Sequence, residues 1–337
     1  MPTPSEIVYQ TIQFQNPSRI PNQLWLLPWA TKRFPNEIEQ IHQDFPDDII
    51  GTGDLRPAGN RTRGDAYAIG ESCDAWGCVR VNLQEGVIGE VKEPLIADPD
   101  WQDRDKLYIP EELLDFDEED INTFCRSTDR FVSTGGFTLF ERMQALRSTE
   151  QFMIDLAYQP KEMVETLMKV HEFNCRLAEK LCRCEIDALM WLDDWGAQNQ
   201  LLIHPRTWVK LFKPLYKDYI DIAKRYGKKT FMHSDGHILA ILPHLIDLGL
   251  DAINSQIFCM GIENLKQYRR KITFWGEIDR QYLLAYGSVD EVAQAVEQVK
   301  EALWCEGGCI AQCEFGVGAK PENVYTVFQT WKRLISG

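Results

Sequence analysis

The chain has 337 residues, of which 44% are hydrophobic and 26% charged, and its formal net charge at pH 7 is −15. This composition is typical of a globular protein, and the acidic excess argues against nucleic acid or an anionic membrane as a partner. No apolar run approaches the length of a membrane span. The amino terminus lacks the pattern of a secretion signal, so we expect the ten cysteines to be reduced thiols in a cytoplasmic protein.

The amino-terminal third predicts few regular elements. Residues 5–13 predict a short helix, residues 23–28 the first strand, and residues 31–46 an exposed helix. Residues 49–115 do not alternate between strand and helix, and glycine-containing turns recur in them. We expect about residues 49–120 to form β-hairpins and loops that are inserted over the mouth of the main fold.

From about residue 130 the pattern becomes a strand followed by a helix, repeated along the chain. Strands are predicted at 130–134, 187–192, 229–233, 252–255, 272–275 and 309–312. Serial strand–helix units indicate parallel strands with right-handed crossovers. At this length a closed (β/α)8 TIM barrel, formed by residues 1–337 as a single domain, is the most economical arrangement. The alternative is a doubly wound open sheet, although no Gly-x-Gly-x-x-Gly turn supports a dinucleotide-binding version.

A polar turn marks the end of one predicted strand. An apolar run ends in His233, Ser234, Asp235 and Gly236, and a helix is predicted at 238–248. His233 and Asp235 are two residues apart, so on a continuing strand they point the same way and share one pocket. The alternative is that His233 hydrogen-bonds the turn and Asp235 caps the following helix.

Polar residues follow nearly every late strand, and in a barrel these strand ends converge on one mouth. They are Asp193, Asp194, His233, Asp235, Asn254, Gln256, Glu277, Asp279, Cys313 and Glu314. Two chemistries fit this set. His233, Cys313 and one carboxylate would hold zinc with a fourth position left open, or carboxylates would act as general acid and base without a metal. Cys313 would otherwise be a buried packing thiol.

Four short motifs carry a family resemblance. They are Asp-Asp-Trp-Gly-Ala-Gln at 193–198, His-Ser-Asp-Gly at 233–236, Phe-Trp-Gly-Glu-Ile-Asp at 274–279 and Pro-Glu-Asn-Val at 321–324. Together they resemble the uroporphyrinogen decarboxylase superfamily, and its corrinoid-dependent methyltransferase branch more than the decarboxylases. The resemblance is best over about residues 125–335 and implies a (β/α)8 barrel. The Arg-Gln-Ala-Gly-Arg stretch with which the decarboxylases bind carboxylates is missing at residues 25–33, so tetrapyrrole decarboxylation ranks second.

The resemblance also implies a zinc site. The methyltransferase branch includes enzymes that hold zinc with a His-x-Cys motif and a distant cysteine. His233 and Cys313 match two of these ligands, whereas Asp235 stands in place of the nearer cysteine. Asp235 or Glu277 would then complete the zinc shell through oxygen. Zinc with fewer thiolate ligands is a stronger Lewis acid, which favours O-demethylation.

The implied activity is that of a methyltransferase, which moves a methyl group between a small donor, such as a methoxylated aromatic compound, and a corrinoid protein. The corrinoid belongs to this partner, because the chain has no Asp-x-His-x-x-Gly cobalamin motif. The expected catalytic residues are Asp193, Asp194 and Glu277, and the expected cofactor-binding residues are Trp25, Trp76 and Gln256. A uroporphyrinogen decarboxylase-type lyase and a non-catalytic ligand-binding barrel are the alternatives. A homodimer is compatible with the sequence.

Overall fold

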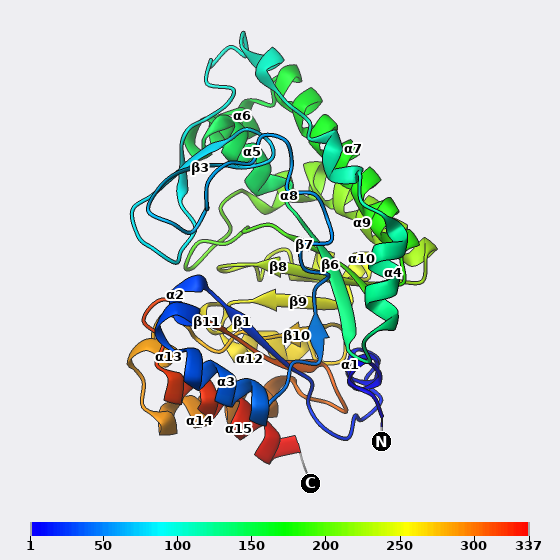
Figure 1. Ribbon diagram of the computed structural model, residues 1–337, viewed down its shortest axis with the longest axis vertical. Helices are drawn as coiled ribbons and strands as arrows, with labels where there is room; N and C mark the ends of the chain where they lie inside the picture. Colours follow the sequence, from blue (N-terminus) through cyan, green and yellow to red (C-terminus); the bar gives the residue numbers. More distant parts are fainter. Residues whose placement is uncertain (1, 336–337) are drawn as a thin grey trace.

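Eight parallel strands form the centre of the computed structural model, which describes residues 2–335 (Figure 1). They are β1 (Asn22–Leu26), β2 (Ile49–Ile50), β6 (Phe131–Phe137), β7 (Ala188–Leu192), β8 (Lys229–Ser234), β9 (Ala252–Ser255), β10 (Thr273–Trp275) and β11 (Cys309–Phe315). Their order is β1-β11-β10-β9-β8-β7-β6-β2, and each neighbouring pair is parallel. The arrangement is a nearly closed (β/α)8 barrel, and this prediction is confirmed.

The gap between β1 and β2 is bridged by aspartate side chains rather than by a strand ladder. The Asp48 carboxylate accepts a hydrogen bond from Asn22 N at 2.7 Å, and the Asp47 carboxylate accepts one from Leu24 N at 2.7 Å. Asp48 N in turn donates to Asn22 O at 2.8 Å. These bonds satisfy backbone groups that an open sheet edge would leave unpaired.

Helix α1 (Pro4–Ile12) covers the amino-terminal end of the barrel. Its residues Val8 and Ile12 belong to one apolar cluster with Phe131, Phe231 and Trp275. Because this cluster takes residues from β2 and from every strand between β6 and β11, it occupies the barrel interior. This end of the barrel is therefore a packed core, and the carboxyl ends of the strands are the ones that can carry a site.

Helices surround the strands (Figure 1), and their apolar faces bury a second, larger core against the outside of the barrel. No described helix is both long and apolar enough to cross a membrane. The α-helices after α1 are α2 (Pro28–Arg33), α3 (Pro35–Asp44), α4 (Glu118–Arg126), α5 (Phe140–Arg147), α6 (Thr149–Tyr158), α7 (Lys161–Arg183), α8 (Pro205–Leu211), α9 (Lys213–Arg225), α10 (Leu242–Leu248), α11 (Ile257–Met260), α12 (Ile262–Leu265), α13 (Leu283–Tyr286), α14 (Val289–Leu303) and α15 (Pro321–Ile335). The 3-10 helices are η1 (Arg104–Lys106), η2 (Glu111–Leu114) and η3 (Lys266–Tyr268).

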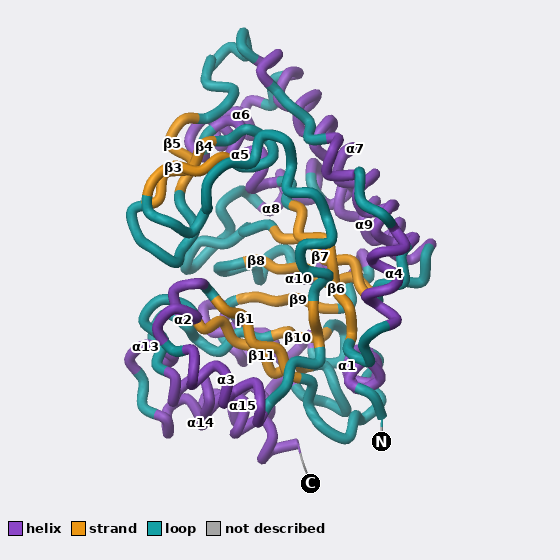
Figure 2. Tube along the Cα trace, in the orientation of Figure 1, coloured by secondary structure: helices purple, strands orange, loops and turns teal. Residues whose placement is uncertain are grey.

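The long segment between β2 and β6, which we call the excursion, forms its own small antiparallel sheet of β3 (Gly70–Cys73), β4 (Val79–Asn82) and β5 (Glu90–Glu93). Figure 2 shows this sheet apart from the barrel strands and close to α5 and α6. An ion pair of 2.5 Å joins Asp74 in the excursion to Arg142 on α5. The ring of Trp76 packs edge-on against Phe173 on α7. These contacts hold the excursion against the helices that follow β6.

Three differences from the predicted elements bear on the barrel and its mouth. Ile49–Ile50 form the second barrel strand, so the excursion begins after residue 50; a strand of two residues carries no periodic signal. The helix predicted at 31–46 is divided into α2 and α3 at Pro35, whose nitrogen cannot donate within a continuous helix. Strand β11 continues through Phe315, so Cys313 and Glu314 lie inside the strand rather than after it.

Candidate metal centre

The loops after β7 and β8 cross at two glycines, and this crossing positions Asp194 and Asp235. Gly236 has a φ of +75°, and a Cβ atom on it would collide with the backbone of Gly196. Gly196 N donates to Asp235 O at 3.1 Å, and Asp235 N donates to the Asp194 carboxylate at 2.8 Å. Only residues without a side chain allow so close an approach, which explains the glycine in each of the two motifs.

Hydrogen bonds fix the orientation of the His233 ring. The Asn254 amide nitrogen donates to Gln312 Oε1 at 2.9 Å, so Asn254 Oδ1 is the atom that faces His233 Nδ1, at 2.6 Å. Nδ1 must therefore carry the proton that it donates. The other ring nitrogen, Nε2, then faces the carboxylates of Asp194 and Asp235. A hydrogen bond from the ring nitrogen that does not bind the metal, here Nδ1, is the usual way in which proteins orient a metal-binding histidine.

The spacing of these donor atoms suits a metal ion better than a hydrogen bond. His233 Nε2 lies 3.5 Å from Asp194 Oδ1 and 3.6 Å from Asp235 Oδ1, and the ligand atoms of the three residues lie within 4.8 Å of one another. An N–H···O hydrogen bond spans about 2.7–3.2 Å. Zinc bonds of about 2.0–2.1 Å separate neighbouring ligand atoms of a tetrahedron by roughly 3.3–3.4 Å. The three residues therefore fit one divalent ion.

The mouth carries a surplus of negative charge. Arg280 pairs with Asp235, with Glu314 at 3.0 Å and with Glu277 at 3.4 Å, so together with Asp194 four carboxylates face one arginine. Burial raises the pKa of Glu277 to about 7, and it also raises the pKa values of Asp194 and Glu314. A divalent cation at Asp194 and Asp235 would offset this surplus.

Several polar atoms at the mouth are buried without a hydrogen-bond partner among the described residues. They are Asp235 Oδ1, Glu277 Oε2 and Gln312 Nε2. An unsatisfied buried group costs about 1–3 kcal/mol, so three of them in one place indicate that the site is built to be completed by a ligand. A cavity of about 140 Å³, lined in part by Gln256, Glu277 and Arg280, opens beside them.

The three predicted cofactor-binding residues lie in different places. Trp25 lies at the mouth, with its ring centroid 5.3 Å from that of His233. Gln256 lines the small cavity of the mouth. Trp76 is outside this group, because it is buried in the excursion against Phe173.

Asp193, which was predicted to be catalytic, has a structural role. Its buried carboxylate accepts hydrogen bonds from Leu139 N and Glu141 N, each at 3.0 Å, at the beginning of α5. It also accepts a hydrogen bond from the Tyr216 hydroxyl at 2.5 Å. Successive residues of an extended chain point in opposite directions. Asp194 can therefore face the mouth only because Asp193 faces the helices.

Cys313, which was predicted to bind zinc, points away from the mouth. In the register of β1 and β11, Cys313 is the partner of Leu24, and Glu314 is the partner of Trp25. Trp25 and Glu314 face the mouth, so Leu24 and Cys313 face the surrounding helices, in whose apolar core they are buried. Burial raises the pKa of the thiol well above its usual value, which opposes formation of a thiolate ligand. Cys313 thus packs in the core, and the structure places Asp194 rather than Cys313 beside His233 and Asp235.

Arg280 is the mouth residue that sequence analysis missed. It lies beyond β10, three residues after Glu277, and nothing in this spacing separates it from an ordinary surface arginine. The sequence held one indirect signal for it: a mouth with several carboxylates is expected to include a cationic side chain. Asn254 was placed at the mouth correctly, but its role in orienting His233 follows only from the hydrogen bonds.

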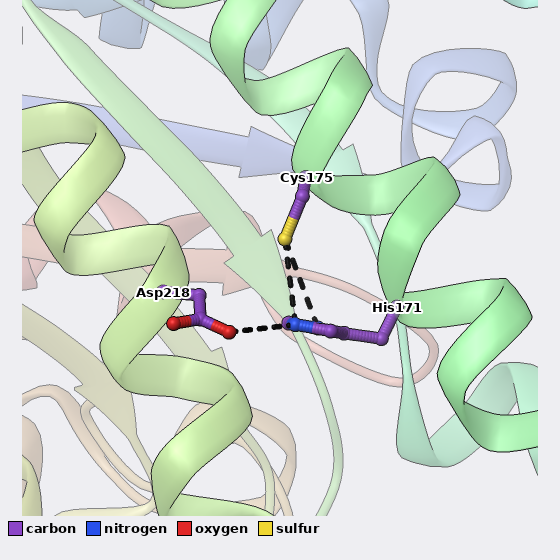
Figure 3. A group of neighbouring side chains, drawn as sticks. All are labelled: His171, Cys175 and Asp218. Atoms are coloured by element: carbon purple, nitrogen blue, oxygen red, sulfur yellow. Dashed lines mark hydrogen bonds and ion pairs between the residues drawn. The ribbon is translucent and has the colours of Figure 1, made fainter.

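A second group of metal-capable side chains lies outside the barrel, on α7 and α9 (Figure 3). His171 Nε2 lies 2.9 Å from Asp218 Oδ2, and His171 Nδ1 lies 3.0 Å from the Tyr219 hydroxyl. Both are hydrogen-bond distances. Cys175 Sγ lies 3.4 and 3.9 Å from the two ring nitrogens, so it sits over the ring face rather than along a lone pair. This group, the outer cluster, is a hydrogen-bonded packing arrangement.

The fold and the mouth define a class of protein, the (β/α)8 barrels that carry a charged, metal-capable site at the carboxyl ends of their strands. The family described as uroporphyrinogen decarboxylase (URO-D) matches residues 75–334. The chain therefore belongs to the uroporphyrinogen decarboxylase family. The matched region contains Asp194, His233, Asp235 and Arg280.

Comparisons with solved structures agree with this fold. A methyltransferase from Methanosarcina mazei is similar, with a TM-score of 0.71, 12% sequence identity and 99% of each chain covered. A B12-independent methionine synthase from Shewanella sp. W3-18-1 is similar with a TM-score of 0.51 and 12% identity, over 94% of this chain and 95% of that one. No curated protein matches the chain. At these identities the comparisons establish a shared fold.

Proposed function

We propose that the protein is a zinc-dependent methyltransferase, which moves a methyl group between a small donor and a separate corrinoid protein. The observation that carries the proposal is the position of His233 Nε2, which faces two carboxylates at 3.5 and 3.6 Å in a barrel of the uroporphyrinogen decarboxylase family. The similar protein from Methanosarcina mazei is named a methyltransferase, which supports the same class of reaction.

The ligand set favours an oxygen-linked methyl group. Asp194, His233 and Asp235 offer three ligands and leave a fourth position open, as in catalytic zinc sites. A bound zinc ion would supply Lewis-acid chemistry toward an atom of the methyl donor. With no thiolate among its ligands the ion would keep more of its positive charge, which suits an ether oxygen. We therefore propose a methyl ether, such as a methoxylated aromatic compound, as the donor.

Glu277 is suited to supply a proton. Burial raises the pKa of its carboxyl group to about 7, and its Oε2 atom has no partner among the described residues. When the methyl group leaves an ether oxygen, both electrons of the broken bond stay on that oxygen, which then needs a proton. Glu277 Oε2 would donate that proton. The electron pair of the new cobalt–carbon bond would come from cobalt(I) of the corrinoid protein.

The neighbouring residues would act by positioning. Asn254 holds His233 in the orientation that directs Nε2 to the ligand site. Arg280 holds Glu277 and Glu314 at the rim of the mouth. Trp25 lies against the His233 ring and would exclude water from that side.

Methyl transfer to cob(I)alamin tests the proposal, because formation of methylcobalamin is followed by absorbance. We expect zinc-loaded wild-type protein to accept methyl ethers and to lose activity after treatment with a chelator. Glu277→Gln should reduce the rate about 100-fold or more. The matched control is Glu263→Gln, an exposed residue of α12, which should leave the rate unchanged. Full activity in metal-free protein would contradict the proposal.

The same preparations separate the alternatives. A tetrapyrrole with many carboxylates needs several cations, whereas the mouth offers one arginine among four carboxylates. Decarboxylation of uroporphyrinogen without methyl transfer would support the lyase. Binding of small ligands without turnover of any substrate would support a non-catalytic barrel.

A further inference from the structure

A large cavity lies between the excursion and the carboxyl end of β6. Its volume is about 520 Å³, which is within the usual range for a small-molecule site. Its walls come from the excursion, including the loop directly after β2, from Gly135 and Gly136 on β6, and from α5 and α7. The cavity therefore lies where the barrel and the excursion meet, and it is distinct from the small cavity beside Arg280.

One wall of the large cavity is aromatic. Trp76 and Phe173 contribute to it, and their ring centroids lie 5.3 Å apart in an edge-to-face arrangement. Phe137 of β6 also lines the cavity. Both Trp76 and Phe173 are buried, so their positions are fixed by packing before any ligand binds. Rigid aromatic walls suit a flat, apolar ring.

Arg56 lines the same cavity, and its guanidinium has no partner. No hydrogen bond or ion pair joins its side chain to any residue between 2 and 335, and its Nε atom is buried. Burial lowers the pKa of Arg56, and no carboxylate opposes that effect. Arg56 is partly exposed, and its planar fork of donors matches a carboxylate. Its guanidinium is therefore available to an anion that comes from outside the chain.

The other strong charges of the cavity are already engaged or face solvent. Arg142 is paired with Asp74 at 2.5 Å. Arg80 donates a hydrogen bond to a backbone carbonyl at 3.1 Å. Asp54 is exposed. Arg56 is thus the cavity cation without any side-chain partner among the described residues, and Arg80, bonded only to a neutral carbonyl, adds positive charge beside it.

Glu141 links this cavity to the metal centre. Its carboxyl group lines the cavity, and burial followed by the charge of Asp194 raises its pKa to about 8. Glu141 N also donates to the carboxylate of Asp193, the chain neighbour of Asp194, at 3.0 Å. Because Glu141 is close enough to Asp194 to feel its charge, the inner side of the cavity adjoins the mouth.

We propose that the large cavity binds a small aromatic carboxylate, with its ring against Trp76 and Phe173 and its carboxylate on Arg56. The planar guanidinium of Arg56 matches the two oxygen atoms of a carboxylate. A ligand held in this way would share the cavity with Glu141, whose backbone nitrogen is bonded to Asp193 beside the mouth. Its role as the methyl donor rests on the proposed function, but its binding does not.

Calorimetric titration with two probes tests the proposal. The probes are 4-hydroxy-3-methoxybenzoate and 2-methoxyphenol, which share the ring, hydroxyl and methoxyl groups and differ in the carboxylate. We expect wild-type protein to bind the acid about 10- to 100-fold more tightly, as expected for a charge-assisted hydrogen-bonded pair. Arg56→Met should remove this preference, and Arg56→Lys should retain part of it. Binding of the phenol should be nearly the same in all three proteins.

The control is Arg63→Met, which changes an exposed arginine of the same segment that does not line the cavity, and the preference for the acid should persist in it. Equal affinity of wild type for the two probes, no binding of either probe, or an undiminished preference in Arg56→Met would overturn the proposal. The titrations use metal-free protein without a corrinoid partner. A failure of methyl transfer therefore leaves their outcome unchanged, and the two proposals can fail separately.

Discussion

Two groups of metal-capable side chains, one at the barrel mouth and one on the outer helices, differ in the partners of their histidine. In the outer cluster His171 Nε2 lies 2.9 Å from Asp218 and Nδ1 lies 3.0 Å from Tyr219, so both ring nitrogens have hydrogen-bond partners. At the mouth His233 Nδ1 is satisfied, whereas Nε2 faces two carboxylates at 3.5 and 3.6 Å. Residue types alone do not identify a metal site, but distances and unsatisfied atoms do.

The two groups also differ in charge. The outer cluster has a single carboxylate, Asp218, whose side chain is exposed to solvent. At the mouth Asp235, Glu277 and Glu314 pair with Arg280, and Asp194 adds a fourth carboxylate beside His233. Buried oxygen atoms of Asp235 and Glu277 have no hydrogen-bond partner among residues 2–335. The outer cluster is therefore complete as a protein structure, whereas the mouth combines the carboxylates and unsatisfied atoms that suit a cation.

The largest expected effect separates the two groups by one matched change. Asp194→Asn should weaken zinc binding about 100-fold or more, because it removes a charged ligand while keeping the shape of the side chain. Asp218→Asn should leave zinc binding unchanged. Competition titration against a chromogenic chelator measures both variants. Equal losses in the two variants would show that the groups do not differ as described.

A substitution where the two loops cross should disrupt the candidate metal site without replacing any of its three ligand residues. Gly236→Ala places a Cβ atom against the Gly196 backbone at positive φ, and we expect a loss of stability of about 2 kcal/mol or more together with weaker zinc binding. Gly227→Ala is the control, because Gly227 also has positive φ but no atom within 4 Å. Chemical denaturation should show a clearly smaller loss for Gly227→Ala. Similar losses would mean that the crossing is unimportant.

The orientation of His233 provides a sharper test of the mouth. Asn254→Leu removes the acceptor for His233 Nδ1 at similar volume, and we expect zinc affinity to fall about 10- to 100-fold. Metal titration and the Glu277-dependent transfer assay should change in parallel. Unchanged affinity would indicate that packing alone orients the ring.

Replacement of the buried thiol should affect stability but not metal. Cys313→Ala truncates a side chain in the core between β11 and the helices, and we expect it to cost about 1 kcal/mol while zinc content stays at the wild-type level. Elemental mass spectrometry and thermal denaturation measure the two quantities. Loss of zinc in this variant would restore Cys313 as a ligand.

The smallest effect concerns pH and the outer cluster. Burial lowers the pKa of His171 below its ordinary value of 6.5, so the unfolded chain binds a proton more readily than the folded protein. The stabilisation that comes from the neutral ring is fully present above about pH 6.5, the pKa in the unfolded chain. It is lost as the pH falls through the lower pKa of the folded protein. His171→Gln should flatten this part of the stability curve, measured by urea denaturation between pH 5 and 8. An unchanged slope would contradict the assignment.

The barrel and the general position of the site were predictable. The parallel strands of a barrel all end at one mouth, and His233 and Asp235 stand at the carboxyl end of one predicted strand. Which of two adjacent polar residues faces the mouth was not predictable. Asp193 and Asp194, like Cys313 and Glu314, alternate in direction, and only the strand register decides between them. The anion-binding role proposed for Arg56 rests on its lack of side-chain partners among the described residues, which no sequence pattern indicates.

Zinc content after loading and dialysis, determined for wild type, His233→Ala and His171→Ala, tests the difference between the two groups most directly. Three vacant ligand atoms at the mouth predict about one zinc per chain in wild type and in His171→Ala, and nearly none in His233→Ala. Zinc that is retained in His233→Ala but lost in His171→Ala would place the metal on α7 and α9 and contradict the account. No zinc in the wild type would contradict it as well.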